Sequence, residues 1–193
     1  MPVSGGKIVA GRWNDCGGDK QQSRTAPAWI LPVRGCRFDD PGRWGRLGRN
    51  GKEQYRKDLA AILAAHDIPY AAQTTFFNGF KDLHTKAERA IYTEGPAFLN
   101  VCAPCPTGWK YQKDEIMEIC KLAVETNYWP LFEVIDGKWI LNYEPKKRLP
   151  IEDFLKTQGR FKHLFKPENE HLIEKYQKEV DRRWEDLLFK CSR

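Results

Sequence analysis

Cys102 and Cys105, a pair of cysteines separated by two residues, are the side chains of this chain with the clearest chemical potential. Cys105 lies between Pro104 and Pro106, directly after an apolar run that is typical of a strand. Prolines fix φ and remove backbone donors, so the sequence predicts a stiff loop around this cysteine. A thiol presented in this way is placed to be a metal ligand or a nucleophile. Cys102, at the end of the strand, is expected to pack in the core.

The other cysteines and the histidines narrow the kind of site that this pair could form. The chain has six cysteines and four histidines, with no second C-x-x-C and no pair of histidines at zinc-finger spacing, which argues against a complete zinc site. A thioredoxin-type pair would open a helix, whereas the prolines favour a loop. Cys120 and Cys191 lie on the apolar faces of predicted helices and are expected to be small core residues.

Charge and glycine are concentrated in the first quarter of the chain. Of the net charge of +6, residues 1–51 contribute +5, and they hold ten of the 15 glycines. Three interpretations of this Gly/Arg-rich segment stay open: an arm that binds nucleic acid, which we do not favour, a segment that does not fold, or a segment that is not native protein. No apolar run approaches a membrane span and no secretion signal is recognised, so a cytoplasmic protein without disulfides is expected.

Residues 52–193 have the regular patterns of an α/β domain. Two strands flank a helix that Asn78 is expected to cap, with Phe80, Leu83, Ala87 and Ile91 on its apolar face. A parallel β-α-β unit is therefore expected, with ligands at the carboxyl ends of its strands. Asp136-Gly137 predicts a hairpin turn. The long apolar stripe of the last helix suggests that it wraps a partner subunit. A first helix is expected from the spacing of Leu59, Ile62, Leu63 and His66, ending before Pro69. The other expected helices are 78–93, 113–126, 151–157 and 168–191, and the expected strands are 70–75, 97–102, 131–135 and 138–143.

The motif Ala103-Pro104-Cys105-Pro106-Thr107-Gly108-Trp109, preceded by Glu94-Gly95-Pro96-Ala97-Phe98, resembles the β subunits of the 2-oxoacid:ferredoxin oxidoreductases, and in particular those of pyruvate synthase. The resemblance continues through His66-Asp67-Ile68-Pro69-Tyr70 and through Thr126-Asn127-Tyr128-Trp129-Pro130, so it covers roughly residues 52 to 190.

The resemblance implies the C-terminal part of a thiamine-diphosphate-binding, Rossmann-like domain, followed by the hairpin and the long helix. It implies oxidative decarboxylation of pyruvate to acetyl-CoA, with electrons passed through a [4Fe-4S] cluster to ferredoxin. The cofactors would be the cluster, thiamine diphosphate and Mg²⁺, and the partners would be the α, γ and δ subunits, ferredoxin, pyruvate and coenzyme A. Cys105 would be the fourth cysteine ligand of the cluster.

The other signatures of the family are missing. No early C-x-x-C supplies the first cluster cysteines, and Gly17-Gly18-Asp19 lacks the strand and the asparagine of a thiamine site. No catalytic or thiamine-binding residue is therefore assigned. The alternatives are a non-catalytic fragment or interaction module with a basic N-terminal arm, or a subunit that acts on another 2-oxoacid.

Overall fold

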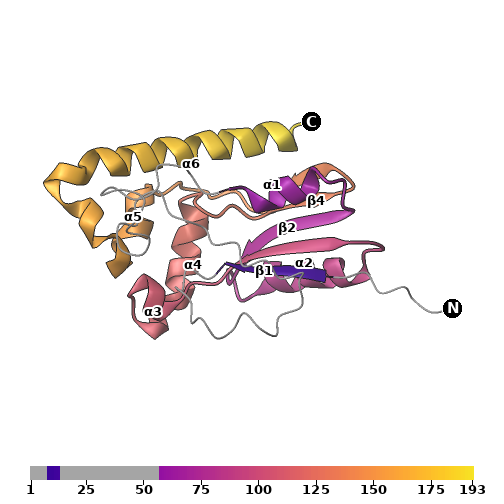
Figure 1. Ribbon diagram of the computed structural model, residues 1–193, viewed down its shortest axis with the longest axis horizontal. Coiled ribbons are helices and arrows are strands. Elements are labelled where there is room, and N and C mark those ends of the chain that lie inside the picture. The colour runs from indigo at the N-terminus through magenta and orange to yellow at the C-terminus, as the bar shows by residue number, and fades with distance from the viewer. Residues whose placement is uncertain (1–7, 14–56) are drawn as a thin grey trace, which may run out of the picture.

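The computed structural model describes residues 8–13 and 57–193. Their strands form one mixed sheet in the order β1-β3-β2-β4-β5, and Figure 1 shows α3, α4 and α5 gathered at one end of it. The α/β class predicted from the sequence is confirmed. The strands are β1 (Ile8–Trp13), β2 (Tyr70–Thr75), β3 (Ala97–Cys102), β4 (Phe132–Ile135) and β5 (Lys138–Leu141).

The parallel half of the sheet contains the predicted β-α-β unit. Strands β2 and β3 pair in parallel, with Thr75 opposite Cys102, and helix α2 (Lys81–Tyr92) connects them. The carboxyl ends of β2 and β3 therefore meet, and the cysteine loop begins there. Gly95 has a φ of 103° between α2 and β3, a conformation that L side chains rarely adopt.

The strands on the two sides of the β2–β3 pair come from different parts of the chain. Six residues of the segment 1–51 form β1, which pairs in parallel with β3, and the rest of that segment lies outside the described residues. The three interpretations given above for the Gly/Arg-rich segment therefore stay predictions. On the other side, β4 is antiparallel to both β2 and β5. Asp136 and Gly137 connect β4 and β5 with φ values of 47° and 78°, as the two-residue hairpin predicted.

Helices cover both faces of the sheet. Helix α2 packs on one face, against Tyr70, Ala72 and Leu99. Helices α1 (Leu59–Ala64) and α6 (Glu170–Cys191) pack on the other, against Ala71 and Phe98. A third cluster of buried side chains joins the end of β3 to the helical end of the molecule. Its elements are α3 (Pro106–Trp109), α4 (Ile116–Glu125), α5 (Ile151–Lys156), the 3₁₀ segments η2 (Lys113–Glu115), η3 (Gly159–Phe165) and η4 (Pro167–Asn169), and α6.

The last helix corrects one prediction. The apolar stripe of α6 packs within the same chain, where Tyr176, Val180, Trp184 and Leu187 are buried, so this stripe gives no reason to place a partner subunit on it. Figure 1 shows α6 extending along one side of the molecule from the helical end to the C-terminus. In the part of the chain that the structure describes, no helix is long and apolar enough to cross a membrane.

The start of α2 corrects a second prediction. Asn78 does not cap this helix: its φ is 49°, and the N-cap position is occupied by Phe80, whose φ is 66°. The helix also faces the sheet with residues that periodicity did not select. Of the four residues expected on the apolar face, Leu83 and Ala87 pack against the sheet as predicted, whereas Phe80 and Ile91 are exposed. Lys86 and Ala90 are buried in their place.

Candidate cysteine site

The predicted loop around Cys105 contains one short helix. Cys105 is the N-cap residue of α3, and Pro106 occupies the first helical position, where its missing N–H costs nothing. The expectation of an uninterrupted loop was wrong because proline is unfavourable inside a helix but favourable at its start. The Sγ atom of Cys105 accepts a hydrogen bond from the backbone N–H of Gly108 at 3.4 Å. The thiol position is thus fixed by the helix that it caps.

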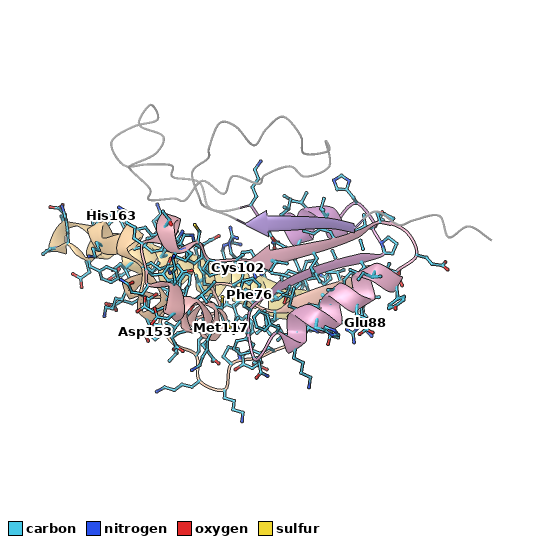
Figure 2. The ribbon with its side chains drawn as sticks, turned by 90° about the horizontal axis from the view of Figure 1, so that it is seen from below. Phe76, Glu88, Cys102, Met117, Asp153 and His163 are labelled. Carbon is cyan, nitrogen blue, oxygen red and sulfur yellow. The ribbon has the colours of Figure 1, made fainter. Side chains whose placement is uncertain are left out.

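The ends of β2 and β3 form the floor beside this loop. Thr75 donates its hydroxyl to the carbonyl of Cys102 at 2.7 Å, which locks the two strand ends together. Cys102 is fully buried, as expected for a core cysteine. Figure 2 shows Cys102 with Phe76, the residue after β2, and with Met117 of α4 on the same side of the molecule.

A second buried thiol reaches this floor from α4. Cys120 is fully buried, and burial raises the pKa of its thiol, although hydrogen bonding with the Thr75 side chain and the Phe76 backbone opposes that rise. Cys120 was predicted only as a core residue of its helix. Its position beside the strand ends depends on how α4 packs, and no spacing in the sequence indicates it.

Trp109 anchors the loop to the helical end of the molecule. Its ring is fully buried and makes edge contacts with Tyr111 and Phe154, at centroid distances of 6.5 and 6.2 Å. The guanidinium of Arg160 lies 3.6 Å from the Trp109 ring centroid. Gly159 donates its N–H to the carbonyl of Lys110 at 3.0 Å, and a Cβ at Gly159 would lie only 2.9 Å from that oxygen. A glycine is required at this contact.

Two donors next to the loop lack acceptors. Among the described residues, neither the indole nitrogen of Trp109 nor the hydroxyl of Tyr111 finds a hydrogen-bond partner, although both atoms are buried. Burial raises the pKa of Tyr111 to about 12, and the nearby thiols of Cys120 and Cys102 add to the rise while Arg160 opposes it. Tyr111 therefore keeps its proton at neutral pH and can act as a donor.

The cysteines differ in oxidation state. Cys105 is disulfide-bonded, whereas Cys102, Cys120 and Cys191 are reduced thiols. Iron is bound by thiolates, so Cys105 could hold a cluster only in its reduced form. Within residues 8–13 and 57–193, no group of three or more His, Cys, Asp or Glu side chains could hold a metal ion. The predicted role of Cys105 as one cluster ligand stays a prediction.

A separate polar cluster fixes α2 to the sheet. The carboxylate of Glu133 on β4 accepts hydrogen bonds from Tyr70, Arg89 and Asn142. Burial raises the pKa of Glu133, but these hydrogen bonds and the charge of Arg89 outweigh it, so the pKa lies below its usual value. Periodicity did not predict this cluster, because the sequence does not indicate which charged residue of a strand will be buried.

The second half of the same cluster lies at Lys86. The Lys86 ammonium is 2.8 Å from the Asp82 carboxylate and donates to the carbonyl of Gln73 at 2.9 Å. Asp82 also accepts from the hydroxyl of Thr74 at 2.6 Å. Burial lowers the pKa of Lys86, and Asp82 opposes that change. These contacts hold α2 against the end of β2.

Comparison with known proteins agrees with the resemblance seen in the motifs. The chain is 44% identical over 139 residues to pyruvate synthase subunit PorB of Thermotoga maritima, which covers 72% of this chain and 43% of that protein. It is 40% identical over 131 residues to PorB of Methanocaldococcus jannaschii, covering 68% and 42% of the two chains.

Relatives that are named ketoisovalerate oxidoreductase subunit VorB share a similar sequence identity with this chain. Ketoisovalerate oxidoreductase subunit VorB of Pyrococcus furiosus is 44% identical over 138 residues, which covers 70% of this chain and 43% of that protein. The chain thus spans less than half the length of these relatives. No protein-family model matches it.

Proposed function

We propose, because this chain is a homologue of the PorB and VorB subunits of the 2-oxoacid:ferredoxin oxidoreductases, that it supplies the cysteine-loop part of a pyruvate synthase β subunit. The observation that carries the proposal is the 44% identity to PorB of Thermotoga maritima over 139 residues. The reaction would be the oxidative decarboxylation of pyruvate to acetyl-CoA, with ferredoxin as electron acceptor. The α, γ and δ subunits and coenzyme A would be the partners, in the cytoplasm.

Cys105 is the residue that we assign to the electron path. A [4Fe-4S] cluster, when bound, would carry electrons from the substrate toward ferredoxin. Cys105 would hold it through a thiolate that α3 positions by the contact between Gly108 and its Sγ atom. The remaining ligands, and the sites of thiamine diphosphate and Mg²⁺, would come from other segments of the subunit and its partners. Turnover would therefore require the assembled complex.

Replacing Cys105 with alanine in that complex is expected to remove one cluster. A cluster of this kind needs four thiolates, so the loss of one ligand leaves an iron exposed to solvent. The complex, purified anaerobically under reducing conditions, should lose the iron and sulfide of one cluster, and substrate-dependent reduction of ferredoxin should fall to background.

Cys191→Ala is the matched control for this substitution. Cys191 is a half-buried thiol of α6 that packs with the other face of the sheet, and its loss should leave the iron content unchanged. Wild-type cluster content and electron transfer in the Cys105→Ala complex would show that the ligand assignment is wrong.

The substrate is tested by direct competition between two 2-oxoacids. The complex is given pyruvate or ketoisovalerate together with coenzyme A, and the reduction of ferredoxin is measured. We expect a higher kcat/KM for pyruvate, because pyruvate synthase subunits are among the relatives that share 38–44% identity with this chain. A higher value for ketoisovalerate would assign the chain to the VorB type, and no turnover of either acid by the complete complex would contradict the proposed function.

A further inference from the structure

Asn78 and Gly79 form a turn between β2 and α2 whose chemistry the proposed function does not use. Both residues are exposed. In an Asn-Gly dipeptide the backbone nitrogen of the glycine can approach the side-chain carbonyl carbon of the asparagine, because glycine has no Cβ to obstruct it. A bond between these two atoms closes a five-membered ring. The turn therefore contains both partners of a reaction that needs no other molecule than water.

Hydrogen bonds do not hold the two reacting groups in place. Within the described ranges, neither the side-chain amide of Asn78 nor the backbone N–H of Gly79 is bonded to another residue. The space beside Gly79 is open, since a Cβ built on it would meet nothing within 4 Å. Solvent can therefore reach the Gly79 nitrogen, and the Asn78 side chain is free to turn toward it.

The backbone of this turn can rearrange at low cost. Asn78 and Phe80 have φ values of 49° and 66°, in the left-handed region that is unfavourable for L residues. The bond from the Lys81 N–H to the Asn78 carbonyl is long, at 3.5 Å. Phe80 is 48% exposed, and its ring contacts that of Phe76 at a centroid distance of 5.5 Å. Because few contacts would be lost, local opening of the turn should require little free energy.

We propose that Asn78 is a site of spontaneous deamidation in the folded protein. The Gly79 nitrogen loses its proton and forms a bond to the side-chain carbonyl carbon of Asn78, and the side-chain nitrogen leaves as ammonia. The product is a succinimide ring. One water molecule then opens the ring at either of its carbonyl groups, which leaves aspartate or isoaspartate at this position. Nothing is oxidised or reduced, and the reaction is independent of the proposed function.

The start of α2 can accept the carboxylate that this reaction creates. Phe80, the N-cap residue, offers no side-chain acceptor to the first turn of the helix. Asp82, the acidic residue of that turn, is already paired with Lys86. Negative charge is favoured near a helix N-terminus, so the aspartate product should leave the chain folded.

Isotope labelling tests the site directly. The full chain is incubated at neutral and mildly alkaline pH in water enriched in oxygen-18, digested at acidic pH in ordinary water, and analysed by tandem mass spectrometry. The peptide that contains Asn78 should lose its amide nitrogen and gain one labelled oxygen, with both aspartate and isoaspartate as products. The rate should rise with pH, because the Gly79 nitrogen attacks after it has lost its proton.

The same digests contain internal controls. The side-chain amides of Asn100, Asn142 and Asn169 each donate a hydrogen bond, so these residues should stay unlabelled. Asn78→Gln is the matched variant, since it keeps an amide at this position but would have to close a six-membered ring, which forms far more slowly. Its peptide should also stay unlabelled.

Two results would overturn the inference. Circular dichroism during the incubation shows that the chain is folded, and a parallel sample is unfolded in urea. Label at Asn78 in the unfolded sample alone would show that the turn protects this residue. Equal labelling of the wild-type and Asn78→Gln peptides would place the reaction at another residue of that peptide.

Discussion

Replacing Asp82 with alanine is expected to lower the free energy of unfolding of this chain by about 3–5 kcal/mol, the usual cost of removing one partner of a buried ion pair. Asp82 is the only carboxylate in the described ranges that is paired with the Lys86 ammonium. The side chain of Lys86 is 1% exposed, so after the substitution its charge would be left inside the protein with only the Gln73 carbonyl as acceptor. The hydroxyl of Thr74 would also lose its acceptor.

Replacing Lys86 instead of Asp82 should lower the free energy of unfolding by less. The difference between the two variants would show that the unpaired buried charge causes the loss. Lys86→Met keeps the length of the side chain and removes the buried charge, while Asp82 is 18% exposed and can turn toward water. The double variant Asp82→Ala, Lys86→Met should therefore be more stable than Asp82→Ala alone, because it no longer contains an unpaired buried ammonium.

The pair of Glu152 and Lys156 is a control with the same spacing. These residues also stand at i and i+4, with 2.8 Å between nitrogen and oxygen, but their side chains are 42% and 57% exposed. Glu152→Ala should change the stability by less than about 0.5 kcal/mol, since exposed helix pairs contribute little. Urea unfolding followed by tryptophan fluorescence measures all four variants. A loss for Asp82→Ala that is no larger than the loss for Glu152→Ala would contradict the role of the buried pair.

The strands and the hairpin were predictable because their signals are local. The run Ala97–Cys102 is apolar on both faces, as a strand covered on both sides must be, and the structure buries five of its six residues. Asp136-Gly137 adopts the positive φ values that a two-residue hairpin turn requires. In each case the information lies within a few neighbouring residues, so no knowledge of the packing was needed.

The orientation of α2 was predictable only in part, because the buried ion pair helps to decide it. Leu83 and Ala87 pack against the sheet as the apolar pattern predicted. Phe80 and Ile91 do not, since the ion pair of Lys86 turns a lysine toward the sheet. The carboxylate of Glu133, which lies on the same face of the sheet, supplies further negative charge to this region. Periodicity counts apolar residues, so it does not recognise a lysine that is buried because Asp82 on the same helix and the Gln73 carbonyl of β2 bind its ammonium.

The candidate site was predictable in one residue only. The motif around Cys105 is contiguous, so its sequence alone suggested a metal ligand. Cys120 approaches the strand ends from outside the motif, and only the packing of α4 brings it there. The oxidation state of Cys105 was likewise not expected, because it depends on a second sulfur and not on the loop itself.

Trp109→Ala is expected to destabilise the chain by about 3–5 kcal/mol, the range measured when large buried aromatic side chains are removed. The ring fills the space between the cysteine loop, Phe154 of α5 and Arg160 of η3, and it is fully buried. Its removal leaves a cavity, and it also releases α3, which is only four residues long and depends on this contact. The substitution should therefore weaken both the fold and the position of Cys105.

Two measurements separate these effects. Chemical denaturation gives the loss of stability, for which Tyr92→Ala is the control, since a 79% exposed side chain should contribute less than about 0.5 kcal/mol. The rate at which an iron chelator removes the cluster from the folded complex reports on the loop, and it should rise for Trp109→Ala but not for Tyr92→Ala. If stability falls while the rate of iron loss stays at the wild-type value, Trp109 supports the core without holding Cys105 in place.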